Sequence, residues 1–184
     1  MKRVVVLLCA CGLAAAAVVT EESMGLLRVG DRAPQFTAVM NTGEKVSLTD
    51  FLGKQALVLF FYPRDETSGC IAEVCSYRDS YVEIRSRGAA VLGVSFDPPD
   101  SHDRFIAHYS LPFPLIADTG RSLSREYGAI RWEGPWPRVK RVTYVIGSDG
   151  IIRGVFHHEL FISKHAAEVL SLLSHMQAVP RRLH

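Results

Sequence analysis

Two cysteines, Cys70 and Cys75, stand five residues apart after an apolar run and a polar turn. The run from Ala56 to Phe61 is short, continuous and rich in aromatic residues, which is typical of a strand buried on both faces. Beyond Cys70, apolar residues recur every three or four positions, a spacing that predicts a helix packed on a sheet. These positions are Val74, Tyr77, Tyr81 and Ile84. Cys70 would then lie in the first helical turn, where backbone N–H groups and the helix dipole stabilise a nucleophilic thiolate.

The residues around Cys70 resemble the active-site pattern of the peroxiredoxins, in which a proline, a threonine and a cysteine stand four and three positions apart. Pro63, Thr67 and Cys70 meet this pattern. With Cys75 following in G-C-I-A-E-V-C-S-Y-R-D, the chain resembles the peroxiredoxin Q group, also called bacterioferritin comigratory proteins. That group usually has a proline where this chain has Ser68. Because the other spacings are kept, we interpret Ser68 as a tuning difference.

The resemblance implies a role for each of these residues. Cys70 would be the peroxidatic nucleophile, which becomes a sulfenic acid, and Cys75 would resolve it as an intrachain disulfide. Thr67 would hydrogen-bond the thiolate or the bound peroxide, and Pro63 would fix the turn and exclude water. Arg141, which opens a β-rich run, would stabilise the thiolate and the charge that develops on the leaving oxygen.

Each assignment has a structural alternative. A buried cysteine is often an inert core residue, a threonine before a helix is often its cap, and a strand-end arginine is often a surface charge. Glu73 either orients Arg141 or is an exposed helix acid. Trp132 and Trp136, just before Arg141, form either a lid or interface at the site or loop aromatics packed on the body.

The resemblance implies a thiol-dependent peroxidase that reduces hydrogen peroxide or organic hydroperoxides. A thioredoxin-like dithiol would return it to the reduced form. This chemistry needs no bound cofactor, and a monomer or weak dimer is expected. One alternative is a copper-binding or copper-delivery protein that resembles the Sco proteins, which use a shorter cysteine spacing. The other is a disulfide oxidoreductase, whose spacing would also be shorter.

The histidines bear on the copper alternative. His157 and His158 are adjacent on an expected strand, so their side chains would point to opposite faces and not share one ion easily. Four further histidines fall on expected helices, where solvated or capping roles are usual. They are His102, His108, His165 and His175. We therefore expect no metal site.

The order of the remaining patterns predicts an α/β domain. Strands are expected at 37–40, 45–47, 89–95, 141–146 and 151–156, the last two as a hairpin around Asp149-Gly150. An edge segment is expected at 111–118, a short helix start at 48–51, and helices at 100–109, 122–127 and 163–176. This order matches the thioredoxin-like fold of the peroxiredoxins, a central mixed sheet flanked by helices.

Residues 1–23 have the pattern of a secretory leader. Met1-Lys2-Arg3 precedes an apolar stretch, and the small residues at 15–17 offer a cleavage site. We expect a thioredoxin-like domain at 24–184 that is exported to the periplasm or an equivalent compartment, where a disulfide is readily sustained. An uncleaved leader would instead tether the protein to a membrane. Cleavage after Ala17 removes Cys9 and Cys11 and leaves 19 basic against 19 acidic residues, which argues against nucleic-acid binding.

Overall fold

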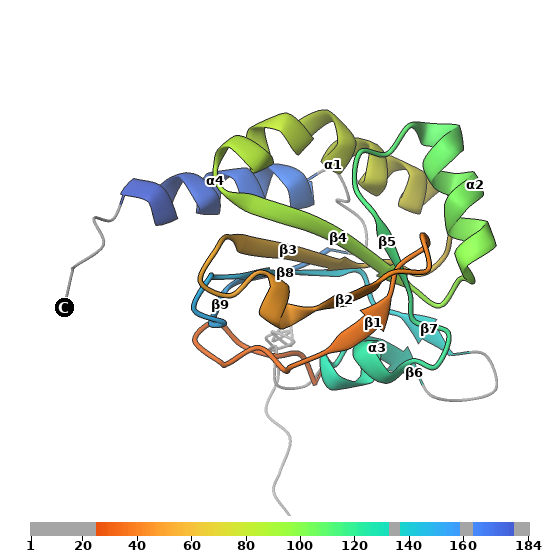
Figure 1. The fold of residues 1–184 in the computed structure, drawn as a ribbon, viewed down its shortest axis with the longest axis horizontal. Coiled ribbons are helices and arrows are strands. Elements are labelled where there is room, and N and C mark those ends of the chain that lie inside the picture. The colour runs from red at the N-terminus through yellow and green to blue at the C-terminus, as the bar shows by residue number, and fades with distance from the viewer. Residues whose placement is uncertain (1–24, 133–136, 159–163, 179–184) are drawn as a thin grey trace, which may run out of the picture.

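Five strands form the central sheet in the computed structural model, which describes residues 25–132, 137–158 and 164–178. Their order is β5-β4-β3-β8-β9 (Figure 1). The strands are β3 Ala56–Phe61, β4 Ala89–Ser95, β5 Leu115–Ala117, β8 Val142–Ile146 and β9 Ile152–His157. Strands β3, β4 and β5 are parallel, whereas β8 runs antiparallel to both β3 and β9. The sheet is therefore mixed, as the sequence predicts.

Three helices cover one face of this sheet (Figure 1). They are α1 Ser68–Ser86, α2 Pro99–Tyr109 and α4 Lys164–Ala178. Smaller elements cover the opposite face (Figure 1). They are β1 Thr37–Val39, β2 Lys45–Ser47, a 3₁₀ turn at Leu48–Asp50, α3 Ser122–Glu126, β6 Ile130–Trp132 and β7 Arg138–Val139. The sheet is thus the middle layer between two apolar clusters.

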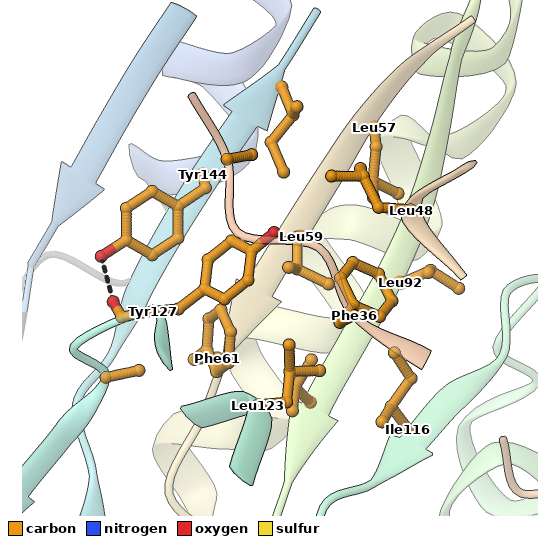
Figure 2. Packing of buried hydrophobic residues seen from close by; sticks show 14 of the residues in the cluster. Phe36, Leu48, Leu57, Leu59, Phe61, Leu92, Ile116, Leu123, Tyr127 and Tyr144 are labelled. Atoms are coloured by element: carbon orange, nitrogen blue, oxygen red, sulfur yellow. Dashed lines mark hydrogen bonds between the residues drawn. The ribbon is translucent and has the colours of Figure 1, made fainter. Parts of the chain in front are cut away.

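Alternate residues of β3 belong to these two clusters. Leu57, Leu59 and Phe61 pack with side chains from the smaller elements, and Figure 2 shows Leu57 beside Leu48 and Phe61 beside Tyr127. The residues between them, including Phe60, pack under the three helices. Since successive side chains of a strand point to opposite faces, burial of both faces requires the continuous apolar run.

The cluster in Figure 2 also contains a polar contact. The hydroxyl of Tyr144 donates to the carbonyl oxygen of Tyr127 over 2.7 Å, which joins β8 to the end of α3. Tyr127 in turn donates its hydroxyl to the carbonyl of Pro34. Two large aromatic side chains therefore fill this core without leaving their hydroxyl groups unpaired.

The sequence predicts most of these elements to within a residue or two, but it misses the β6–β7 hairpin. Its strands are only three and two residues long, and their pairing has a shifted register. Such short segments carry no readable alternation. Trp132 ends β6, whereas Trp136 and the expected leader lie outside the described residues. In the part of the chain that the structure describes, no helix is long and apolar enough to cross a membrane.

Candidate active site

The turn that follows β3 places Cys70 at the start of α1. Thr67 takes the N-cap position with an extended backbone, φ −87° and ψ 144°, and its carbonyl accepts the N–H of Ile71. Cys70 is the third residue of the helix and has no solvent-exposed surface. Its thiol therefore lies in the first turn, where the backbone N–H groups favour a negative charge.

Arg141 brings a permanent positive charge to this thiol. It directly precedes β8, the neighbour of β3, and its Nη2 lies 3.5 Å from Sγ of Cys70. Its Nη1 pairs with the carboxylate of Glu73, one helical turn beyond Cys70. Both charged side chains are buried, Arg141 with 6% and Glu73 with 0% of its surface exposed. Glu73 is thus not the exposed acid of the alternative interpretation, but lies where it orients Arg141.

The charges around Arg141 also affect its proton affinity. Burial lowers the pKa of Arg141, but the negative charges of Glu73 and Cys70 outweigh burial and raise it. Arg141 Nε has no hydrogen-bond partner among the described residues, although it is buried. A guanidinium with one N–H available is suited to receive an oxygen atom on which negative charge develops.

Thr67 and Pro63 lie in the turn itself. Thr67 is exposed, and its hydroxyl donates to the carbonyl oxygen of Arg64 over 3.1 Å. Thr67 is the cap of α1 by position, as the alternative interpretation expected, but its side chain makes no cap bond to the helix. Pro63 is half-buried and directly follows the fully buried Tyr62. Ser68, the position where the group usually has proline, is exposed as the first residue of α1.

Cys75 occupies the same helix in a different setting. It is half-buried at the margin of the helix-side core, and both cysteines are unbonded thiols. Five residues of regular helix separate two Cα atoms by about 8.7 Å and about 140° around the axis. A disulfide needs Cα atoms within about 7 Å and converging side chains. The intact helix therefore keeps Cys70 and Cys75 apart.

A chain of buried hydroxyl and imidazole groups lies behind the ion pair, and sequence reasoning missed it. Tyr77 on α1 and Thr143 on β8 share a hydrogen bond of 2.8 Å, and Thr143 Oγ1 lies 2.9 Å from Nδ1 of His165 on α4. The same nitrogen lies 3.7 Å from Glu73. Burial lowers the pKa of His165 to about 4, so the ring is neutral near pH 7. Its Nε2 faces the carbonyl oxygen of His158 at 3.3 Å and therefore carries the hydrogen, which leaves Nδ1 to accept from Thr143.

A second buried polar cluster joins the active-site turn to α2. Asp65 and His102 pair at 2.9 Å, with 4% and 0% of their surfaces exposed. The expectation that helical histidines are solvated or capping is therefore wrong for His102 and His165, but His108 and His175 are exposed. The available signal was spacing, because His102 precedes the inward Phe105 by three positions and so shares its helix face.

The other histidines within the described residues belong to no large ligand set. His158 pairs with Glu168 at 2.9 Å, and its ring centroid lies 5.2 Å from that of His165. Among the residues that the structure describes, no group of three or more His, Cys, Asp or Glu side chains is arranged to hold a metal ion.

The sequence profile of the AhpC/TSA family matches residues 29–155, most of the chain. This chain belongs to the AhpC/TSA family. It is 40% identical over 145 residues to the chloroplastic peroxiredoxin Q of Gentiana triflora. This alignment covers 78% of this chain and 65% of that protein. It is 35% identical over 151 residues to a putative peroxiredoxin bcp of Coxiella burnetii, and this alignment covers 80% of this chain and 99% of that protein. The peroxiredoxin Q resemblance is therefore confirmed, although the chain spans less than two thirds of the Gentiana protein.

A solved structure supports the same conclusion about the fold. Peroxidoxin BcpB of Mycobacterium tuberculosis superposes with a TM-score of 0.77 and 30% identity, over 82% of this chain and 98% of that one. The expected thioredoxin-like fold of the peroxiredoxin type is confirmed. Peroxiredoxins are thiol-dependent peroxidases, which places this chain among the oxidoreductases. These relatives give no support to the copper-delivery or disulfide-oxidoreductase alternatives.

Proposed function

We propose that this protein reduces hydrogen peroxide or organic hydroperoxides with Cys70 as the peroxidatic nucleophile. The observation that carries the proposal is the contact of a buried helix-start thiol with Arg141 at 3.5 Å. The Cys70 thiolate attacks the terminal oxygen of the peroxide, forming an S–O bond as the O–O bond breaks. Cys70 becomes a sulfenic acid, and the leaving oxygen takes a proton to become water or an alcohol. Arg141 stabilises the thiolate and then the charge on the leaving oxygen.

The turn supplies the remaining parts of the site. Thr67, three residues before Cys70, positions the peroxide through its exposed hydroxyl. Pro63 is half-buried and limits the freedom of the turn beside the thiol. Glu73 acts through Arg141, because its carboxylate fixes one side of the guanidinium and leaves the other side toward sulfur.

Cys75 completes the cycle in this proposal. Its thiol attacks the sulfenic acid of Cys70, which forms an intrachain disulfide and releases water. A thioredoxin-like dithiol then attacks this disulfide, and both cysteines return to thiols while the reductant is oxidised. Because the helix separates the two cysteines, the first turns of α1 must unwind before the disulfide can form.

The direct test is peroxide consumption by the purified protein with a protein dithiol and a metal chelator present. The wild-type protein should remove one peroxide per dithiol oxidised, and Cys70→Ser should abolish the reaction, because a serine hydroxyl is not ionised near neutral pH. Cys75→Ser makes the same substitution in the same helix and should still consume one peroxide per protein molecule, so it serves as the matched control. Activity of Cys70→Ser above a trace would contradict the assignment, and dependence on added copper would favour the delivery alternative.

The leader pattern supports a further part of the proposal, export to a compartment outside the cytoplasm. N-terminal sequencing of the protein purified from its own cells should then begin near Val18. A start at Met1 in the soluble cytoplasmic fraction would contradict export. The proposed monomer or weak dimer is checked by light scattering across a range of protein concentrations.

A further inference from the structure

The turn with Pro63 and Thr67 has an internal bond from Thr67 to Arg64, but its conformation also depends on contacts outside the turn. Glu66, directly before Thr67, has a φ of 58°, in the left-handed region that a residue with a side chain seldom adopts. The carboxylate of Glu66 makes only exposed contacts at 3.3 to 3.4 Å, with Tyr109 and His108. Such a conformation persists only where the surrounding structure holds it. The neighbouring Asp65 has the buried contacts that join this turn to the rest of the fold.

Both carboxylate oxygens and the backbone N–H of Asp65 have hydrogen-bond partners. One carboxylate oxygen accepts from the hydroxyl of Tyr62 at 2.7 Å, and the other accepts from Ser101 at 2.7 Å and from His102 at 2.9 Å. The backbone N–H of Asp65 donates to Asp97 at 3.0 Å. Three of these four partners lie on α2 or just beyond β4, outside the turn. The position of the turn is therefore set by α2 and the end of β4.

His102 places a buried imidazole against Asp65. The two nitrogens of its fully buried ring face the carboxylate of Asp65 and, at 3.2 Å, the carbonyl oxygen of Ile116. The nitrogen that faces Asp65 also lies 3.4 Å from the hydroxyl of Tyr62. Burial raises the pKa of Asp65, but the interaction with His102, together with the hydroxyl groups of Tyr62 and Ser101, outweighs burial and lowers this pKa. A buried carboxylate is costly without such partners, so Asp65 depends on the contacts that α2 supplies.

We propose that Asp65 and His102 are positioning residues of the peroxide reaction, which hold the turn on α2 so that Thr67 and Cys70 meet one peroxide together. This inference rests on the proposed function, because it needs Thr67 to contact the peroxide. Neither Asp65 nor His102 touches the reacting atoms, so both act through the turn. The loss of either partner frees the turn and the first residues of α1. Peroxide reduction then slows, whereas the thiol of Cys70, buried in the native helix, becomes more accessible.

The test compares two reactions of Cys70 in the reduced full-length protein. Hydrogen peroxide oxidation is followed by stopped flow, and iodoacetamide alkylation by mass spectrometry. Asp65→Asn and His102→Asn should lower the rate constant with peroxide about 10- to 100-fold, as a misplacement of about 1 Å does. The same variants should raise the alkylation rate. Asp100→Asn, an exposed acid on α2, and His175→Asn, an exposed histidine on α4, are the matched controls and should change neither rate.

Global unfolding would also slow oxidation and speed alkylation, because it removes the contact with Arg141 and exposes the buried thiol. Each variant is therefore first shown by circular dichroism to be folded under the assay conditions, and opposite signs in the folded variant support positioning. A parallel fall of both rates, or no change in either, overturns the proposal. Should both variants fail to fold, Ser101→Ala removes one hydroxyl from Asp65 and leaves the contact with His102, and it must show the same opposite signs on a smaller scale. An unchanged Ser101→Ala then overturns the proposal. A wild-type protein without peroxidase activity would defeat the proposed function as well, whereas an active wild type with unchanged variants defeats only the positioning role.

Discussion

Cys70 and Cys75 share helix α1, but their surroundings differ in kind. Cys70 is fully buried and lies 3.5 Å from Arg141, whose other side pairs with Glu73. Cys75 is half-buried at the margin of the core. The first cysteine is thus fixed by contacts from a distant part of the chain, whereas the second is placed mainly by its own helix. The reactivity of Cys70 with peroxide therefore depends on tertiary contacts. Resolution of its sulfenic acid depends instead on local unfolding of α1, which brings Cys75 to Cys70.

The middle of α1 is anchored to the sheet by Tyr77. The hydroxyl of Tyr77 bonds to Thr143, and its ring stacks on Phe60 with centroids 4.6 Å apart. Tyr77 stands directly after the segment 68–76, which must unwind for the disulfide to form. We therefore expect unwinding to stop at Tyr77, because further unwinding would expose this buried hydrogen bond.

The largest effect on turnover is expected from the substitution of Cys75, which must move to reach Cys70. Cys75→Ser should abolish turnover with a protein dithiol, because no thiol in the helix remains to condense with the sulfenic acid. The first oxidation should keep its rate, since the contact of Cys70 with Arg141 is untouched. A sulfenate-specific reagent and mass spectrometry should find the label on Cys70. Normal turnover of Cys75→Ser would show that Cys75 is not needed to resolve the sulfenic acid.

The next largest effect is expected in the hydrogen exchange of the backbone amides of α1. Backbone amides of residues 71–76 should exchange slowly in the reduced protein and orders of magnitude faster in the disulfide form, because their helical hydrogen bonds are lost. Amides of 78–85, beyond the Tyr77 anchor, should remain protected in both forms and serve as the internal control. Equal protection of 71–76 in both forms, with the disulfide confirmed by mass, would show that the helix need not unwind.

Substitution of Arg141 tests the tertiary contacts that surround Cys70. Arg141→Ala should slow oxidation of Cys70 by about 100-fold, the effect of removing one group that stabilises a developing oxyanion. Arg141→Lys should recover part of the loss, because it keeps the charge but not the planar fork that binds Glu73 and sulfur together. Stopped-flow oxidation measures both. Arg138→Ala, an exposed arginine on β7, is the control, and an equal effect there would contradict a specific role.

The smallest effect is on stability and comes from His165 behind the ion pair. Burial lowers its pKa to about 4, so the unfolded chain, with an ordinary pKa of 6.5, binds a proton that the folded chain does not. This contribution to stability is complete above pH 6.5 and is lost as the pH falls toward 4. The loss amounts to about 2 kcal/mol at pH 5 relative to pH 7.5.

Urea unfolding at pH 7.5 and pH 5 measures this contribution. The difference between the two pH values should shrink by about 2 kcal/mol in His165→Asn, because asparagine does not titrate. His175→Asn, at an exposed position of α4, should keep the wild-type difference. A wild-type difference in His165→Asn would show that the ring is not kept neutral by burial.

The sequence by itself determined the parts that depend on neighbours along the chain. The apolar run of β3 and the spacing of Val74 and Tyr77 predicted the strand and the helix, because burial of a strand or a helix face leaves a regular pattern. The polar stretch after β3 placed the turn, and Cys70 was placed in the first helical turn because it continues the apolar stripe of α1. The family resemblance added Arg141, which no local pattern singles out from other arginines.

Only the tertiary structure decided which polar side chains lie inside and with whom. Glu73 meets Arg141 across 68 positions of sequence, Asp65 meets His102 across 37, and Thr143 meets His165 across 22. A charged or imidazole side chain on a helix is solvated unless the fold supplies a partner, and a periodic pattern carries no record of that partner. Expectation therefore favoured exposed histidines, whereas the packing of α2 and α4 against the sheet buried His102 and His165 with groups that satisfy them.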